Sequence, residues 1–162
     1  MTRLKARISL FPVLKDNLQA LTLLAQLHKK IFGPHRERIW SVNDFSALAI
    51  LPTSALNIVY VGEEPIGLVT FSCVAGEAEL LSLGLEVAYE GQGLAGEVMH
   101  LLRRYLKDNG IQDLYLEVRE NNERAINFYE GHGFYQTGLR RNYYTLTDGT
   151  KVHAVTMALK IV

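Results

Sequence analysis

The sequence has little of what disulfide-linked, metal-bound or membrane-spanning proteins contain. Its only cysteine is Cys73, which excludes an internal disulfide and a zinc site made of cysteines. No apolar run reaches the ~18 residues that a membrane-spanning helix needs. An excess of one charge is also missing, because 17 Lys and Arg residues balance 17 Asp and Glu residues. Nucleic-acid binders are usually more basic, so we expect a cytoplasmic protein that binds neither nucleic acid nor membrane.

Linker sequence is equally scarce. The four prolines are scattered, and no Pro-, Gly- or Ser-rich stretch divides the chain. At ~150 residues per domain, the length predicts one domain over residues 1–162. Near the start, Arg3, Lys5 and Arg7 precede an apolar stretch that contains Pro12 and is too short for a secretion signal.

The hydrophobic pattern predicts seven strands and four helices in the order βααβββαβαββ. Strands are expected at residues 6–11, 56–61, 66–74, 78–87, 114–118, 134–139 and 152–159. Helices are expected at residues 18–31, from a cap at Ser41 or Asn43 to residue 50, at 94–106 and at 125–129. Breaking residues separate these elements at 33–34, at 62–65 (a hairpin turn), and at Gly131 and Gly133. The order predicts an α/β protein with a mixed, mostly antiparallel sheet.

The most informative segment is residues 81–96, where a predicted strand leads through a glycine-rich turn directly into a helix. The first N–H groups of a helix lack partners, and the helix dipole favours anions there. Glycines let the backbone approach a phosphate closely. The segment therefore predicts a phosphate-binding loop, with an ordinary strand-to-helix turn as the alternative.

Two ligand classes compete for this loop. Gly91, Gly93 and Gly96 form the Gly-x-Gly-x-x-Gly pattern of dinucleotide-binding proteins, and Glu117 lies where the ribose-binding acid is expected. A dinucleotide fold continues through several more βα units, whereas only 45 residues follow Glu117. The layout therefore favours a second class of phosphorylated ligand.

Residues 89–95 resemble the acetyl-CoA loop of the GNAT acetyltransferases, whose pattern is Arg/Gln-x-x-Gly-x-Gly/Ala. Gly93 and Ala95 match this pattern, but Glu90 stands where the family usually has Arg or Gln. A carboxylate near a diphosphate is unfavourable unless it points away. Residues 116–134 resemble the second family signature, Leu-Glu-Val-Arg-x-x-Asn-x-x-Ala-Ile-x-x-Tyr-x-x-x-Gly-Phe. Residues 140–159 narrow the resemblance to members that acetylate the N-terminal alanine of a ribosomal protein.

The resemblance implies the GNAT fold, acetyl-CoA as acetyl donor and no metal. It implies that Glu117 is the general base and Tyr129 the general acid. Asn122 is then expected to bond the pantetheine arm, and the backbones of Leu83 and Leu85 to pair with its amides. The N–H groups implied to cradle the diphosphate are those of Gln92, Gly93, Leu94, Ala95 and Gly96.

Each of these residues also has a purely structural alternative role. Glu117 as a strand acid would face solvent or pair with Arg119, and Tyr129 would be a core aromatic. Tyr143 and Tyr144 either wall the acceptor groove or only pack. The remaining expectations are a solvated face for Arg140 and Arg141, an inert core thiol for Cys73, and structural or surface roles for His28, His35, His100, His132 and His153.

The acceptor is the open part of the functional prediction. We expect direct transfer to the N-terminal α-amine of a protein, a ribosomal protein among the candidates, by a monomer or homodimer. A small amine such as a polyamine, amino acid or aminoglycoside is the first alternative. A non-catalytic acyl-CoA-binding module is the second, because of Glu90.

Overall fold

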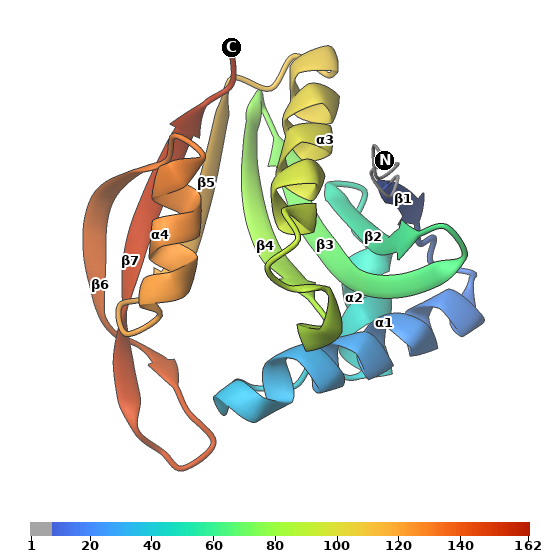
Figure 1. The fold of residues 1–162 in the computed structure, drawn as a ribbon, viewed down its shortest axis with the longest axis horizontal. Helices are drawn as coiled ribbons and strands as arrows, with labels where there is room; N and C mark the ends of the chain where they lie inside the picture. The colour runs from blue at the N-terminus through green and yellow to red at the C-terminus, as the bar shows by residue number, and fades with distance from the viewer. Residues whose placement is uncertain (1–7) are drawn as a thin grey trace, which may run out of the picture.

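The computed structural model describes residues 8–162, which form a twisted sheet with α1 and α2 against one face and α3 and α4 against the other (Figure 1). The seven strands lie in the order β1-β2-β3-β4-β5-β7-β6, and only β4 and β5 are parallel neighbours. The strands are β1 (Ile8–Pro12), β2 (Ser54–Val61), β3 (Glu64–Val74), β4 (Glu77–Leu85), β5 (Asp113–Arg119), β6 (Tyr135–Thr145) and β7 (Lys151–Lys160). The helices are α1 (Leu18–Phe32), α2 (Val42–Ile50), α3 (Leu94–Asp108) and α4 (Glu123–Gly131), with short 3-10 turns η1 (Gly33–His35) and η2 (Val87–Tyr89). The predicted fold class and element order are confirmed.

Adjacent residues of the central strands point into two separate hydrophobic cores. On β2, Ile58 belongs to the core under α1 and α2, whereas Val59 belongs to the core under α3. Leu68 and Val69 repeat this division on β3. Side chains alternate between the two faces of a strand, so the middle of the sheet is buried on both sides and gives the site a rigid support.

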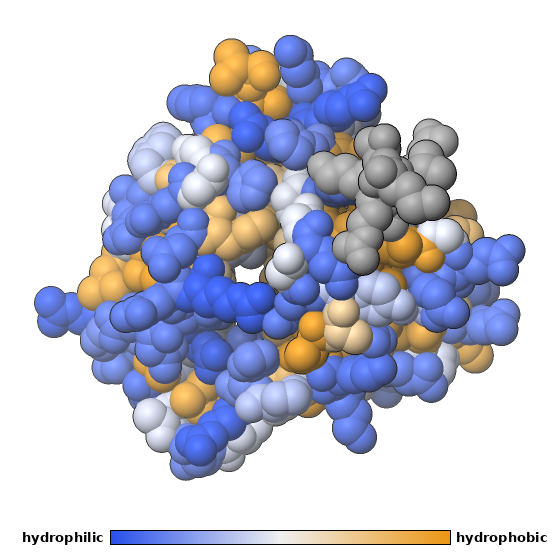
Figure 2. All heavy atoms as spheres, viewed as in Figure 1, coloured by the Kyte–Doolittle hydropathy of each residue, from blue (hydrophilic) through white to orange (hydrophobic). Residues whose placement is uncertain are grey.

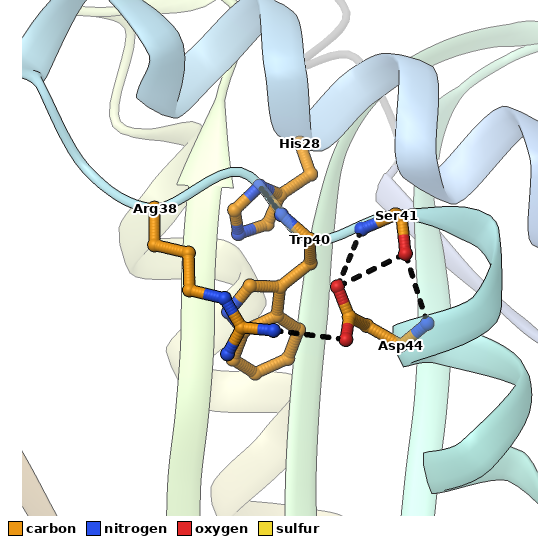
Figure 3. A network of polar contacts seen from close by, with 5 residues as sticks. All are labelled: His28, Arg38, Trp40, Ser41 and Asp44. Carbon is orange, nitrogen blue, oxygen red and sulfur yellow. Dashed lines mark hydrogen bonds and ion pairs between the residues drawn. The ribbon is translucent and has the colours of Figure 1, made fainter. Parts of the chain in front are cut away.

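Side-chain caps fix where the first two helices begin. The Asn17 side chain accepts a hydrogen bond from the first turn of α1. At α2, the Ser41 hydroxyl accepts from the N–H of Asp44, and the Asp44 carboxylate accepts from the N–H of Ser41 at 2.8 Å (Figure 3). This reciprocal pair is a capping box. Of the two predicted caps, Ser41 is therefore the one used, and Asn43 is not.

The strands β4 and β5 pair only over their first halves. Their register runs from Glu77 opposite Asp113 to Leu80 opposite Leu116. Beyond this point β4 stays bonded to β3, while β5 stays bonded to β7. The two strands therefore part toward their carboxyl ends (Figure 1), which leaves one edge of β4 without a partner strand.

Two glycines bring the end of α1 against this open part of β4. A Cβ atom on Gly84 would lie 2.7 Å from a methyl carbon of Ile31 and 2.8 Å from the ring of Phe32. A Cβ atom on Gly67, the neighbour on β3, would lie 2.2 Å from the carbonyl oxygen of Gly84. Only glycine permits these approaches, so the two positions fix the wall that α1 and β4 share.

Three predicted boundaries at the ends of β3 and β4 are wrong by a few residues. The strand predicted over 78–87 ends at Leu85, because the N–H of Glu86 makes a last bond to Ile66 and the chain then enters η2. The hairpin turn predicted over 62–65 is shorter, since Pro65 already pairs with Tyr60. The strand predicted to begin at residue 66 consequently begins at Glu64.

Of the next two predicted elements, the helix fits and the strand is longer than expected. The helix predicted to contain residues 125–129 and to end at Gly131 and Gly133 extends over Glu123–Gly131, and Gly133, with φ of 94°, turns the chain away. The strand predicted over 134–139 extends to Thr145 as β6. Almost all of β6 is exposed and its register shifts twice, so it lacks the alternation that predicts a strand.

The structure describes only part of the predicted amino-terminal strand. The strand predicted over residues 6–11 appears as Ile8–Pro12, and residues 6 and 7 lie outside the described residues, as do the cations weighed against a secretion signal. Across residues 8–162, no helix combines the length and apolarity that crossing a bilayer requires.

Candidate active site

The glycine-rich loop delivers bare backbone N–H groups to the start of α3. Gly91 and Gly93 have φ of 72° and 76°, a conformation that favours glycine. Gly93 precedes α3 directly, and no side chain of the described residues caps the helix there. The first N–H groups of α3 therefore remain able to bind an anion.

This loop opens on a cavity of about 620 Å³. The surface is hollowed between α4 and the segment before α3, and mainly hydrophilic side chains border the hollow (Figure 2). From β4 and the loop, the lining includes Leu83, Gly84, Leu85, Tyr89, Glu90, Gly91, Gly93, Leu94, Ala95 and Gly96. From α1, the loop after it, the end of β5 and α4, the lining includes Ile31, Phe32, His35, Glu37, Arg119, Asn122, Arg124, Ala125, Phe128, Tyr129 and His132.

The cavity brings together most of the residues that the sequence predicts to bind a cofactor. Leu83 and Leu85 line it at the parting of β4 and β5. Asn122 lines it and also caps α4, since its Oδ1 accepts from the N–H of Ala125 at 3.2 Å. Gln92 is the exception: it is not in the lining, and its side chain donates back to the carbonyl of Ala88 at 3.2 Å.

Tyr129 lines the same cavity from α4. Its ring packs on Phe128 and Phe134, with centroids 5.3 Å and 5.4 Å away. Burial raises the pKa of the Tyr129 hydroxyl above its usual value, and the nearby Glu37 carboxylate raises it further. The phenol therefore remains protonated and able to donate at neutral pH.

Glu117 lies in a different hollow. It lines a shallow groove of about 460 Å³ over β4, β5, β6 and β7 rather than the cavity that holds Tyr129. Its carboxylate pairs with Arg140, Oε1 to Nε at 3.1 Å. Arg140 is thus not merely part of a solvated face, and Arg119, the partner considered from the sequence, pairs elsewhere.

Tyr143 and Tyr144 gather around Glu117. The Tyr144 hydroxyl donates to the backbone carbonyl of Glu117 at 3.1 Å, and burial raises its pKa. A hydrogen bond to Glu117 raises the pKa of Tyr143, whose ring lies 5.2 Å from the guanidinium carbon of Arg140. After burial, the Glu117 carboxylate and Tyr143, the Glu37 carboxylate also raises the pKa of Tyr144.

Sequence reasoning missed the pair formed by Glu37 and Arg119. Arg119 Nη2 lies 3.5 Å from Glu37 Oε1, and Nη1 donates to the carbonyl of His35 at 3.0 Å. Burial raises the pKa of Glu37, while Arg119 and then His35 oppose the rise. Arg119 stands in the second family signature and was open to detection. Glu37 follows Gly33 and Pro34 in a loop without any pattern.

The unusual Glu90 has a specific partner. Its Oε2 accepts from Arg124 Nη1 at 2.8 Å, and Arg124 belongs to the first turn of α4. The carboxylate that disagrees with the family pattern is therefore neutralised across the cavity rather than left beside the N–H groups of the loop.

The histidines and the cysteine mostly follow expectation. His28 is buried beneath α2. His35 and His132 line the cavity, which the sequence did not indicate, and burial followed by His100 and Arg103 lowers the pKa of His132. Cys73 is only partly buried on β3, not in the core, and burial raises the pKa of its thiol. In residues 8–162, no three His, Cys, Asp or Glu side chains group as a metal site requires.

Sequence comparison assigns the class of protein. Residues 16–134 match the profile of the acetyltransferase (GNAT) family, and the chain belongs to that family. It is therefore an N-acetyltransferase that takes its acetyl group from acetyl-CoA, which sets aside the dinucleotide-binding alternative.

Particular relatives refine this assignment. The chain is 36% identical over 105 residues to the ribosomal protein bS18-alanine N-acetyltransferase of Haemophilus ducreyi, covering 64% of this chain and 72% of the relative. The enzyme of the same name from Escherichia coli (strain K12) is 41% identical over 88 residues, which cover 54% of this chain and 59% of that enzyme. A crystal structure of the ribosomal-protein-S18-alanine N-acetyltransferase from Escherichia coli matches with a TM-score of 0.79 and 27% identity, over 96% of this chain and 94% of that one.

The described residues fit acetyl-CoA. The uncapped first turn of α3 suits the diphosphate. The open edge of β4 at Leu83 and Leu85 suits an arm that carries amide groups. Apolar Phe128 and Ala125 lie beside Tyr129 at the other side of the cavity.

Proposed function

We propose that this N-acetyltransferase acetylates the N-terminal α-amine of a protein, with a ribosomal protein whose chain begins with alanine as the first candidate. The supporting observation is the open groove that Glu117 and Tyr115 line, with Tyr143 and Tyr144 in contact with Glu117. An open groove with aromatic side chains at Glu117 suits an extended chain end better than a small molecule. The similarity to the two bS18-alanine N-acetyltransferases supports the same choice.

We assign the cofactor to the cavity. When bound, acetyl-CoA supplies an acetyl group that is already activated as a thioester. The N–H groups of residues 92–96 hold its diphosphate, and those of Gly93, Leu94 and Ala95 are the best oriented for it by their place at the start of α3. The backbones of Leu83 and Leu85 and the side chain of Asn122 hold the pantetheine arm.

In this proposal Glu117 removes the proton from the acceptor nitrogen. A free α-amine has a pKa of about 7.7–8.0, so a carboxylate in contact with it, directly or through one water, is a sufficient base. Arg140 holds the Glu117 carboxylate at 3.1 Å. Arg140 thereby fixes its orientation toward the groove.

Tyr129 completes the transfer by giving its proton to the departing thiolate sulfur. The new N–C bond forms as the C–S bond breaks, and the phenol hydroxyl supplies the proton that the thiol needs. The raised pKa of Tyr129 keeps its hydroxyl protonated throughout the neutral pH range. Tyr144 holds the backbone of Glu117 in place through the bond from its hydroxyl to the Glu117 carbonyl.

A small polycationic amine is the second candidate acceptor. Glu77, Glu79 and Glu117 line the groove together with one cation, Arg140. A net negative groove attracts a positively charged acceptor, whether a basic peptide or a polyamine.

The test compares acceptors under identical conditions. The purified protein receives acetyl-CoA with an alanine-starting peptide, the same peptide with a blocked N-terminus, or spermidine. Free CoA thiol and product mass are measured. We expect acetylation of the free peptide alone. Equal turnover with the blocked peptide or faster turnover with spermidine would contradict an α-amine acceptor.

A further inference from the structure

An ion pair crosses the cofactor cavity. Glu90, in the loop before α3, and Arg124, in the first turn of α4, both line the cavity and meet at 2.8 Å. They stand 34 positions apart in the sequence and come from different walls. A diphosphate bound at the start of α3 would share this cavity with the pair, since Gly93, Leu94 and Ala95 line it too.

The loop itself supplies no positive side chain. Residues 89–96 contain no lysine or arginine, and Glu90 is their only charged residue. Backbone N–H groups and the helix dipole offer only a partial positive charge. A diphosphate is bound most strongly when a guanidinium also contacts it, so the cavity needs a cation from elsewhere.

The other cations of the cavity are already engaged. Arg119 is held by the carbonyl of His35 and by Glu37, and its side chain is only 12% exposed. The lowered pKa of His132 keeps its ring neutral at neutral pH. Arg124, by contrast, is 72% exposed and has Glu90 as its ion-pair partner. Exposed ion pairs contribute little to stability, so Arg124 exchanges partners easily.

We propose that Arg124 is a diphosphate-binding residue of the acetyl-CoA site, and that Glu90 holds its guanidinium over the cavity until the cofactor takes it. The inference rests on the use of acetyl-CoA and adds a side chain to the backbone cradle. It accounts for Glu90, whose charge serves to position Arg124. On binding, Arg124 turns from the carboxylate to the phosphates, and Glu90, already 34% exposed, turns to solvent.

The test measures binding rather than turnover. Wild-type protein, Arg124→Gln, Arg124→Lys and Glu90→Gln are titrated calorimetrically with acetyl-CoA. Each is also titrated with S-acetyl-pantetheine, which has the same acyl arm without phosphates. Arg104→Gln, an exposed arginine on α3 outside the cavity lining, is the matched control. Melting temperatures verify that each variant is folded.

We expect Arg124→Gln to raise the Kd of acetyl-CoA about tenfold and to leave that of S-acetyl-pantetheine unchanged. The weakening should shrink as salt is added, since screening reduces the contribution of an exposed charge. Arg124→Lys should keep most of the affinity. Glu90→Gln should weaken acetyl-CoA binding by about threefold, because Arg124 is no longer held over the cavity.

Two results would overturn the role of Arg124 alone: wild-type affinity in Arg124→Gln, or the same loss for both ligands. Unchanged or tighter acetyl-CoA binding by Glu90→Gln would overturn the holding role of Glu90. A wild-type protein that fails to bind acetyl-CoA would overturn the cofactor site itself, and with it this inference.

Discussion

The cofactor side and the acceptor side of this site are held together by different interactions. On the cofactor side, Gly93 and the first turn of α3 present backbone groups. On the acceptor side, the Glu117 carboxylate pairs with Arg140 from β6, and the Tyr144 hydroxyl donates to the backbone carbonyl of Glu117. Backbone groups follow from local conformation, whereas each ion pair needs two distant segments to meet. Donor recognition can therefore stay constant while the acceptor side changes with few substitutions.

Removing the Tyr129 hydroxyl should have the largest effect on the chemical step and none on cofactor binding. We expect Tyr129→Phe to lower kcat about a hundredfold to a thousandfold, with the Kd of acetyl-CoA unchanged, because the ring still packs on Phe128 and Phe134. Thiol release and calorimetry measure the two quantities. Tyr144→Phe is the control and should lose far less. Undiminished kcat in Tyr129→Phe would remove this residue from the acid role.

Acid should loosen the loop between α1 and α2, which carries Glu37, through protonation of His28. His28 Nδ1 accepts from the N–H of Trp40 at 3.3 Å, and the two rings stack with centroids 5.3 Å apart (Figure 3). Burial lowers the pKa of His28 from 6.5 to about 4, with Asp44 partly opposing. Since the folded pKa is the lower one, stability is complete above pH 6.5 and is lost as the pH falls to about 4.

The loss from His28 amounts to at most about 3 kcal/mol. Denaturant unfolding across this pH window measures it. His28→Asn keeps an acceptor but does not titrate, so its free energy of unfolding should fall less over the same window. Identical slopes for the variant and the wild type would show that another group is responsible.

Neutralising Glu117 should give a pH-dependent loss. We expect Glu117→Gln to lower the rate about tenfold to a hundredfold, chiefly at low pH, where most of the acceptor amine is protonated. A pH–rate profile measures this. Arg140→Gln is the matched comparison, because it breaks the same ion pair but leaves the carboxylate. A Glu117→Gln profile parallel to that of the wild type would contradict the base role.

Glu37→Gln should have the smallest effect and tests how much the Glu37–Arg119 ion pair in the cavity wall contributes to stability. The pKa of Glu37 is raised because burial outweighs the attraction of Arg119. Its charged form therefore lowers stability as the pH rises above 4.5. The variant should match or slightly exceed the wild type in urea unfolding at neutral pH, within about 0.5 kcal/mol. Marked destabilisation, absent in the turn variant Glu63→Gln, would mean that the ion pair dominates.

The parts that follow from local sequence were predictable. The glycines of residues 91–96, the apolar stripe of α3 and the cap at Asn122 each lie within one short segment. The order of elements also followed from periodicity. The predicted strand was shorter than β6, because the exposed residues of β6 show no alternation of polar and apolar side chains.

The parts that depend on distant contacts were not predictable. Nothing near Glu37 indicates Arg119, which lies beyond β4 and α3, and nothing near Glu117 indicates Arg140. Glu117 on β5 and Tyr129 on α4 line separate hollows, and this placement depends on how the two elements pack in the fold. A sequence signature specifies residue types and their spacing. The packing of the whole fold decides which distant residue each of them contacts.

The parting of β4 and β5 has a consequence for how the donor enters. Gly67 and Gly84 lock β3, β4 and the end of α1 together at contacts that no side chain permits, so the opening between the strands belongs to the folded chain itself. No backbone hydrogen bond between β4 and β5 has to break to admit the pantetheine arm. Such pre-organisation spares binding the free energy of rearrangement. We expect association with the donor to be fast and nearly independent of the acceptor.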